Sequence, residues 1–204
     1  MTIKVGDKLP AATFTAGTPE GPRPLSTADI LAGKKVAPFA VPGAFTPTCS
    51  AKHLPGFKEH VADFRAKGVD AIACVSVNDA FVMKAWGESQ SVGDDILILG
   101  DGNGDFTDGM GLLVDKQELG FGKRSWRYPM LVKDGVGAKM CIEPNKPGDP
   151  FEVSDADTML AYVAPQATAP ADVVVFTRPG CPFCAKAKGM LHDAGIDFDE
   201  LVLN

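Results

Sequence analysis

The chain has 204 residues, of which 45% are hydrophobic and 23% charged, and its formal net charge at pH 7 is −6. This composition is ordinary for a globular protein, and the length allows one substantial core with a smaller appended segment. The acidic balance and the lack of a Lys/Arg run exclude a general nucleic-acid binder. No apolar run suits a membrane span or a secretory leader, so we expect a cytoplasmic protein without membrane contacts.

Apolar, β-branched runs alternate with amphipathic stretches along residues 1–163, which predicts an α/β fold. An Asp-Gly pair between two apolar runs predicts a hairpin turn at residues 134–135. Strands are expected at residues 35–41, 70–77, 96–100, 130–133 and 139–143.

Three helices are expected in the same part of the chain. The first follows a Pro-rich turn, carries an apolar face up to Gly68, and should kink at Pro55. The second begins after Asp79, which is a suitable N-cap residue. The third begins near Ser154, and its predicted buried side consists of Met159, Leu160 and Val163.

The composition changes after residue 163. Residues 164–171 are rich in Ala and Pro without apolar periodicity, which predicts a linker. Residues 172–204 then open a new β-α-β unit, with strands at 173–176 and 198–203 and a helix to about His192. Such a short unit cannot close a core alone, so we expect it to be the N-terminal part of a larger domain.

A cysteine stands where the first predicted strand turns into the first helix. The segment PGAFTPTCS brings Cys49 into the first helical turn, where unpaired N–H groups and the helix dipole favour a thiolate. The dipole contributes at most about 2 kcal/mol, so a cationic partner is needed, and Arg127 is the candidate. A lone cysteine would more often be a buried structural residue, so the sequence around Cys49 has to decide between a structural and a reactive role.

A second motif, Cys181-Pro-Phe-Cys184, lies between a predicted strand and a predicted helix. Such a pair is either half of a zinc site or a redox dithiol. The three histidines show no paired ligand spacing, and the strand-turn-helix setting favours a dithiol with Cys181 ionised at the helix start. We therefore predict no metal site.

Two further features are predicted to have no catalytic role. The acidic segment 101–105 resembles the start of a calcium loop, but Phe106 and Leu112 stand where Gly and Glu are needed. We interpret it as a polar turn before a helix. His53 lies four residues after Cys49, and we expect it on a helix surface because no acyl-binding signature accompanies it.

The segments PGAFTPTCS, HLPGF and RSWRYPML together resemble peroxiredoxins of the type 5 class, and the resemblance covers most of residues 4–164. It implies a thioredoxin-like fold in which Cys49 attacks a hydroperoxide and becomes a sulfenic acid. It also implies that Thr46 and Arg127 position both peroxide oxygens while Pro42 shields the thiolate.

The resemblance also bears on the other cysteines of this part of the chain. Some type 5 members use a resolving cysteine after the hairpin, but no cysteine lies between Glu143 and Arg178. Cys141 does not occupy that place, and Cys74 lies within a predicted strand, where a buried residue is expected. A one-cysteine mechanism therefore fits this chain better.

The segment from Val173 to Leu191 resembles the opening of a glutaredoxin. The resemblance implies that Cys181 is an attacking thiol, that Arg178 and Phe183 flank a glutathione site, and that the rest of this site lies downstream. Glutathione would then be the reducing co-substrate, and no bound cofactor is implied. The expected partners are a hydroperoxide, glutathione or a glutaredoxin, and a second copy in a homodimer.

Two other functions stay open at this point. A peroxide sensor would pass its oxidation to a partner protein by disulfide relay, without sustained turnover. A pure disulfide oxidoreductase would use only the C-terminal dithiol, with residues 1–163 binding its substrates. Steady peroxide consumption that depends on Cys49 distinguishes a peroxidase from both.

Overall fold

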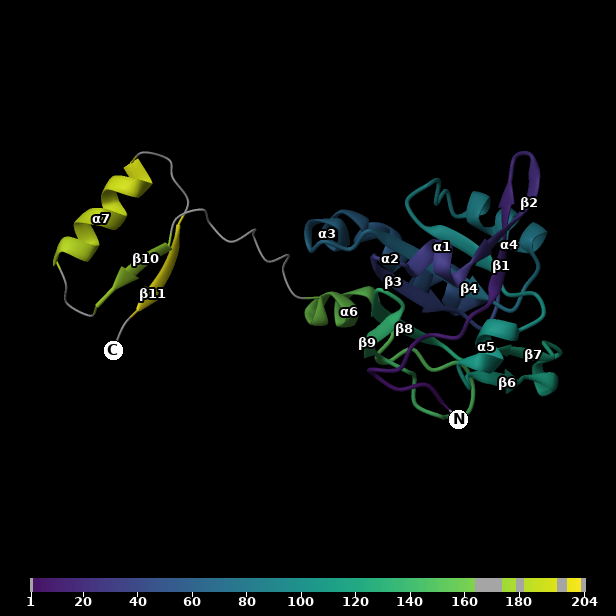
Figure 1. Cartoon of the computed structure of the whole chain (residues 1–204). Coiled ribbons are helices and arrows are strands. Elements are labelled where there is room, and N and C mark those ends of the chain that lie inside the picture. Colours follow the sequence, from purple (N-terminus) through teal and green to yellow (C-terminus); the bar gives the residue numbers. More distant parts are fainter. Residues whose placement is uncertain (1, 164–173, 179–181, 194–197, 203–204) are drawn as a thin grey trace. The chain divides into compact units, whose positions relative to one another are not determined.

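The computed structural model describes residues 2–163, 174–178, 182–193 and 198–202 (Figure 1). The chain divides into two compact units, Met1–Pro165 and Gln166–Asn204, and each is described by itself. The expected linker at residues 164–171 lies outside the described residues.

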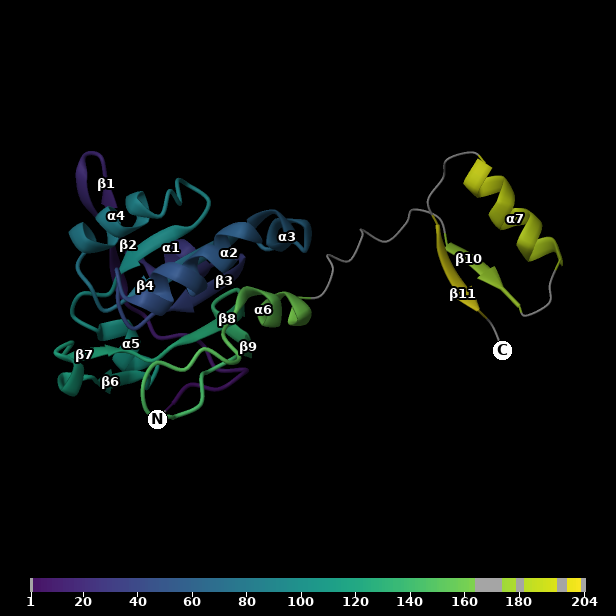
Figure 2. The ribbon, with the colours of Figure 1, turned by 180° about the vertical axis from the view of Figure 1, so that it is seen from behind.

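A seven-stranded sheet forms the centre of the first unit, in the order β2-β1-β5-β4-β3-β8-β9. Figures 1 and 2 show this unit from opposite sides. The central strands β3, β4 and β5 run parallel, and the outer pairs β1–β5, β1–β2, β3–β8 and β8–β9 are antiparallel. The strand bounds are β1 Thr13–Thr18, β2 Gly21–Ser26, β3 Lys35–Ala40, β4 Ala71–Ser76, β5 Leu97–Gly100, β8 Tyr128–Lys133 and β9 Val136–Met140.

The predicted hairpin is confirmed, with one correction. Asp134 and Gly135 both have positive φ, 48° and 74°, which is the backbone of a two-residue hairpin turn. Such a tight turn lets β9 begin at Val136, three residues earlier than the sequence predicted. A short separate ribbon, β6 (Leu113–Asp115) with β7 (Lys123–Ser125), encloses the 3₁₀ turn η2 (Gln117–Leu119).

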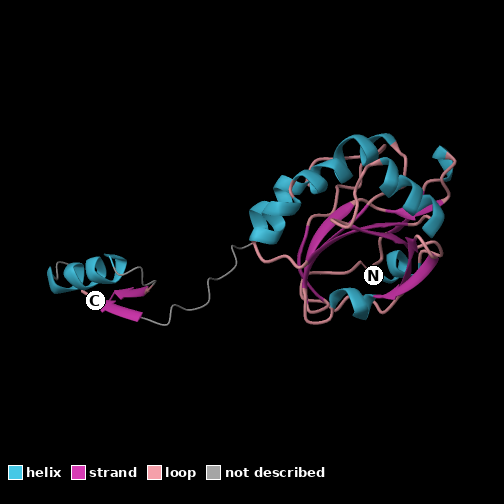
Figure 3. Cartoon of the chain, turned by 90° about the horizontal axis from the view of Figure 1, so that it is seen from above, coloured by secondary structure: helices cyan, strands magenta, loops and turns pink. Residues whose placement is uncertain are grey.

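Helices cover both faces of the large sheet (Figure 3). Strand β3 serves both sides, since Phe39 packs into the core cluster on one face and Val36 and Ala40 into that on the other. This double coverage explains the continuous apolar runs of the central strands and confirms the α/β class. One face is covered by α2 (Leu54–Glu59), α3 (Val61–Ala66), α4 (Ala80–Ser89) and α6 (Ala156–Tyr162), and the other by α1 (Thr27–Leu31) and α5 (Asp105–Gly109).

The first predicted helix is present, but in three parts. It opens at Pro47, runs as a π-helical segment from Cys49 to His53, and continues as α2 and then α3. The backbone N–H of Leu54 bonds to the carbonyl of Cys49, and Pro55 has no N–H to donate, so the wide turn ends where the proline begins. His60, with φ −96° and ψ 13°, separates α2 from α3.

The other two helix starts are nearly as predicted. Asp79 caps α4, and its carboxylate accepts from the N–H groups of Phe81 and Val82. Helix α6 has Asp155 as its N-cap, one residue after the predicted Ser154, because the Asp155 carboxylate accepts from Thr158.

The second unit contains β10 (Val174–Thr177), α7 (Pro182–Asp193) and β11 (Asp199–Val202), which confirms the predicted β-α-β order. The two strands are parallel. Glu200 joins the elements, since it accepts from Thr177 Oγ1 at 2.7 Å and from Lys188 Nζ at 2.8 Å. Across the described residues of both units, no helix has the length and apolarity needed to cross a membrane.

Candidate active site

The loop after β3 delivers Cys49 to a helix start. Thr46 Oγ1 donates to the carbonyl of Gly43 at 2.8 Å, and the carbonyl of Thr46 accepts from the Ser50 N–H at 3.0 Å. Thr46 therefore closes the turn and opens the helix, and Cys49 falls in the first helical turn, as predicted. Its side chain is fully buried.

Two neighbouring elements hold this loop. The Asn78 amide oxygen, just after β4, accepts from the Ala44 N–H at 3.1 Å and from Ser76 Oγ at 2.8 Å. From α4, Trp86 Nε1 donates to Ser50 Oγ at 3.0 Å. The position of Cys49 is thus tied to the parallel strands and to α4.

Arg127 lies between β7 and β8 and is only 1% exposed. Its Nη2 lies 3.5 Å from Cys49 Sγ, so the structure brings together the two residues that the sequence singled out. Its Nε has no hydrogen-bond partner among the described residues and remains a buried, available donor.

Asp149 neutralises this buried cation, and sequence reasoning missed it. Both carboxylate oxygens lie 2.6 Å from Arg127 Nη2, while the side chain of Asp149 is 37% exposed. A buried guanidinium without a counter-charge is strongly destabilising, so this pair allows Arg127 to sit beside the cysteine. Asp149 lies in the irregular segment between β9 and α6, where the sequence carries no periodic signal.

The prediction for His53 was wrong, since this residue is fully buried and not on a helix surface. Its Nδ1 lies 3.0 Å from Arg127 Nη1, and a guanidinium can only donate, so Nδ1 accepts and the ring is neutral with its proton on Nε2. Burial and the charge of Arg127 hold the pKa of His53 well below 6.5, although the Ser154 backbone opposes this. The rings of Phe39 and Phe151 pack against the imidazole, with centroids 4.9 and 5.4 Å away.

A pocket of about 220 Å³ lies beside the loop and the helix start that lead to Cys49. Pro42 and Thr46, two of the predicted site residues, line it together with Asp149. The other lining residues are Pro47, Thr48, Lys116, Leu119, Phe121 and Gly148. Cys49 and Arg127 are not among the lining residues, and Thr48 brings the wall of the pocket to the residue just before Cys49.

Cys74 and Cys141 have a different environment. Cys74 is fully buried on β4, as predicted, and burial raises the pKa of its thiol well above 9.0. Cys141 follows β9, and burial raises the pKa of its thiol too. Both residues are thiols that resist ionisation, which disfavours them as nucleophiles.

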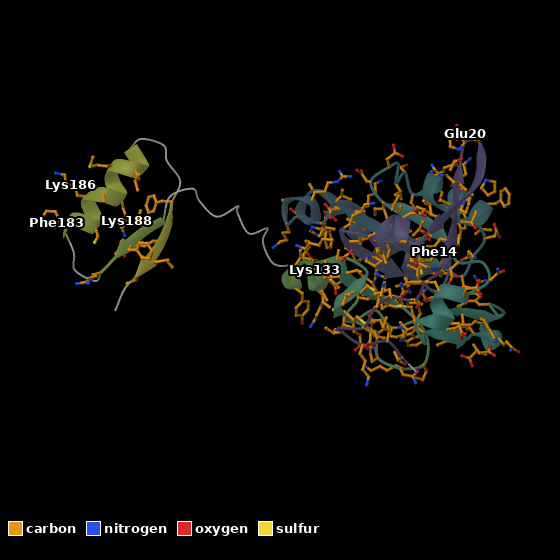
Figure 4. The ribbon with its side chains drawn as sticks, viewed as in Figure 1. Phe14, Glu20, Lys133, Phe183, Lys186 and Lys188 are labelled. Carbon is orange, nitrogen blue, oxygen red and sulfur yellow. The ribbon has the colours of Figure 1, made fainter. Side chains whose placement is uncertain are left out.

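The predicted residues of the second unit are only partly described. Cys181 lies outside the described residues, while Cys184 is half-buried on α7. Phe183 is 82% exposed at the start of α7 and points away from the two strands (Figure 4), and Arg178 is exposed after β10.

The acidic segment 101–105 has a structural role. The Asp101 carboxylate accepts from the N–H groups of Phe106 and Thr107 at 3.2 and 2.9 Å, so it caps the start of α5. This confirms the polar turn before a helix. Among the described residues, no group of three His, Cys, Asp or Glu side chains could hold a metal ion.

A buried cysteine at a helix start, beside a buried arginine and behind a small pocket, on a thioredoxin-like α/β sheet, defines the thiol peroxidase class. The redoxin family model matches residues 4–160, and the glutaredoxin model matches residues 173–204. The chain belongs to the peroxiredoxin family, in the hybrid form that carries a glutaredoxin segment. It is a thiol-dependent peroxidase, and enzymes of this family need no prosthetic group.

Individual relatives agree with this assignment. The hybrid peroxiredoxin hyPrx5 of Haemophilus influenzae is 54% identical over 203 residues, which cover 100% of this chain and 84% of that protein. A Synechocystis peroxiredoxin is 52% identical over 77% of this chain and 89% of its own length. The crystal structure of reduced Prx3 from Vibrio vulnificus with hydrogen peroxide has a TM-score of 0.75 and 49% identity, covering 79% of this chain and 99% of its own.

Proposed function

We propose that Cys49 is the peroxidatic nucleophile, that Pro42, Thr46 and Arg127 assist it, and that glutathione is its reducing co-substrate. The observation that carries the proposal is the 3.5 Å contact between Arg127 Nη2 and Cys49 Sγ, made inside a fully buried helix start. A fixed cation at that distance stabilises the thiolate and the charge that develops during oxygen transfer.

In the oxidation step, the Cys49 thiolate attacks one oxygen of a hydroperoxide. The S–O bond forms as the O–O bond breaks, and the leaving oxygen takes up a proton to become an alcohol, or water from hydrogen peroxide. Thr46 Oγ1 donates to Gly43, so its lone pairs are free to accept the peroxide O–H. The unpartnered Arg127 Nε can donate to the leaving oxygen. Pro42 shields the thiolate from water.

In the reduction step, a glutathione thiolate attacks the sulfur of the Cys49 sulfenic acid. The S–S bond of a mixed disulfide forms, and the hydroxyl group leaves as water after taking a proton. A second thiol then attacks the glutathione sulfur and releases Cys49. We assign this second thiol to Cys181 or to another glutathione, with Arg178 and Phe183 flanking the tripeptide and Cys184 completing the dithiol. The match to the glutaredoxin family supports this assignment.

The same proposal covers the domain boundaries, the cellular location and the oligomeric state. Residues 1–163 form the peroxidase domain, residues 164–171 a linker, and residues 172–204 the glutaredoxin part, which agrees with the two family matches. A cytoplasmic location suits recycling by glutathione, which needs a reducing compartment. A homodimer would cover large apolar side chains that one copy leaves exposed, among them Phe45, Phe81 and Leu119.

Arg127→Lys tests the proposal, with Arg124→Lys as the matched control. Arg124 hydrogen-bonds to the carbonyls of Phe121 and Val77, and within the described part of the chain it makes no hydrogen bond to Cys49. Stopped-flow oxidation by hydrogen peroxide should slow by about two to three decades in Arg127→Lys and far less in the control. Equal rates in the two variants would contradict the need for a guanidinium at position 127.

A further inference from the structure

Lys116 is a buried lysine in the wall of the active-site pocket. It lies between β6 and η2 and is only 8% exposed, and both Lys116 and Gly148 line the pocket beside the helix start that leads to Cys49. Its Nζ donates to the carbonyl of Gly148 at 3.1 Å and lies 4.6 Å from the ring centroid of Trp126. The ammonium group is therefore held at the pocket and not in open solvent.

The described residues give this ammonium no carboxylate partner. Neighbouring Asp115 accepts instead from the backbone and side-chain N–H groups of Gln117, at 2.8 and 2.7 Å. Asp149, in the same pocket, is paired with Arg127. An ammonium has three donors, and only the bond to Gly148 is made. A cation in a pocket wall that lacks a carboxylate partner is available to pair with a negatively charged group of a ligand.

We propose that this pocket binds a carboxylate group of a substrate and that Lys116 is its cationic partner. Leu119 and Phe121 give the pocket apolar walls for the carbon chain between the carboxylate and the reacting atom. This inference rests on the proposed role of Cys49, since Pro42 and Thr46, which are proposed to assist that residue, line the same pocket.

Two substrates carry the required chemistry. Glutathione brings two carboxylates and would be bound while its sulfur attacks the sulfenic acid. A hydroperoxide with a terminal carboxylate would be bound while its O–O group meets the thiolate. Both present a carboxylate to Lys116. Because glutathione acts in the reductive half-reaction and the hydroperoxide in the oxidative one, measuring each half-reaction shows which substrate the site binds.

Lys116→Met removes the charge and keeps an unbranched side chain. Lys139→Met is the matched control, because Lys139 also lies over an aromatic ring, 3.7 Å from the Tyr162 centroid, but does not line this pocket. The reductive half-reaction is measured with glutathione and with its diethyl ester. The oxidative half-reaction is measured with a carboxylate-bearing alkyl hydroperoxide and with its methyl ester.

In wild type we expect the acid to react with a higher kcat/KM than its ester in one of the two half-reactions. That preference should fall about tenfold in Lys116→Met, persist in Lys139→Met, and return in Lys116→Arg, which keeps the charge. A lysine that only ties Gly148 in place would slow acid and ester alike. An equal loss for both, or no acid preference in wild type, overturns the proposal.

The same experiment separates this inference from the role of Cys49. If Cys49 were not the nucleophile, wild type would fail to form its sulfenic acid with either hydroperoxide. A Cys49 that is oxidised normally, in a protein that shows no acid preference, would contradict the Lys116 site alone.

Discussion

Arg127 is a fully buried cation whose position depends on side chains from two separate segments. His53 from the π-helical segment accepts from Nη1, and Asp149 from the irregular segment before α6 accepts from Nη2. Nη2 is at the same time the atom closest to Cys49 Sγ. His53 is therefore a positioning residue, since it orients the guanidinium without touching the reacting atoms.

Replacing His53 tests this positioning role. In His53→Leu the Nη1 donor of Arg127 loses its acceptor, so the rate of Cys49 oxidation should fall about ten- to a hundredfold. His53→Asn can place an amide oxygen where Nδ1 stands and should recover most of the rate. Stopped-flow kinetics with hydrogen peroxide makes the comparison. Equal oxidation rates in His53→Leu and His53→Asn would show that His53 only fills space in the core and does not position Arg127.

The lowered pKa of His53 has a consequence for stability. Below pH 6.5 the unfolded chain protonates this histidine, whereas the folded protein keeps it neutral beside Arg127. Unfolding therefore becomes easier as the pH falls, by up to about 1.4 kcal/mol per pH unit. The stability of wild type relative to His53→Asn should decrease between pH 7 and pH 5 in denaturant titrations.

The sequence predicted part of this site because chemistry and register agreed. Cys49 stood out at a predicted helix start and Arg127 as a cation just before a predicted strand, and the resemblance to peroxiredoxins added Thr46 and Pro42. His53 was missed because a single histidine near a helix start resembles a surface residue. Its position four residues before Phe57, on the apolar face of that helix, was the available signal.

At the scale of elements, the segment between β9 and α6 is organised by Glu143. This residue is buried, and its carboxylate accepts from the backbone N–H groups of Glu152, Val153 and Ser154 at 2.8–3.0 Å. The bonds close a loop that contains Asp149 and Phe151. The counter-charge of Arg127 and the ring beside His53 thus depend on one carboxylate.

Glu143→Gln should loosen this loop. The substitution replaces a charged carboxylate acceptor by a neutral amide, which should lower the free energy of unfolding by about 1.5–3 kcal/mol at pH 7. Glu118→Gln, at an exposed position, is the matched control and should cost little. Urea titration measures both, and a Glu143→Gln variant as stable as its control would contradict the role.

The pH dependence of the same variant has a definite sign. Burial alone would raise the pKa of Glu143, but the hydrogen bonds from residues 152–154 outweigh it and hold the pKa below 4.5. The stabilisation is therefore complete above pH 4.5 and is lost as the pH falls through the folded-state pKa. The difference in unfolding free energy between wild type and Glu143→Gln should therefore become smaller below pH 4.5.

Elements with a continuous apolar run were predictable, and those without one were not. Strands β3 and β4 are covered on both faces, so nearly all their residues are buried and apolar. The edge strand β2 reads GPRPLS, in which two prolines and a glycine give no strand signal. Among the described strands β2 pairs with β1 alone, and an edge without a second partner tolerates the missing N–H donors.

At the scale of the whole molecule, every described contact of Cys49 and Arg127 lies within the first unit. Peroxide reduction should therefore not need the C-terminal dithiol. In the Cys181→Ser variant, we expect peroxide to oxidise Cys49 at the wild-type rate. Steady-state turnover at high glutathione should also be nearly normal. Turnover should slow only at low glutathione, where recycling of the mixed disulfide is limiting. A slower oxidation step in Cys181→Ser would contradict this division of work.

The central claim is that Cys49 takes up the peroxide oxygen. The most direct measurement is a single turnover of the reduced protein with one equivalent of hydrogen peroxide, quenched with dimedone and mapped by mass spectrometry. Cys74→Ser is the matched control, because it removes a buried thiol with a raised pKa in the same core cluster. The label should appear on Cys49 in wild type and in Cys74→Ser, and Cys49→Ser should consume less than a few per cent as much peroxide. A label on another cysteine, or peroxide consumption that survives in Cys49→Ser, would contradict the account.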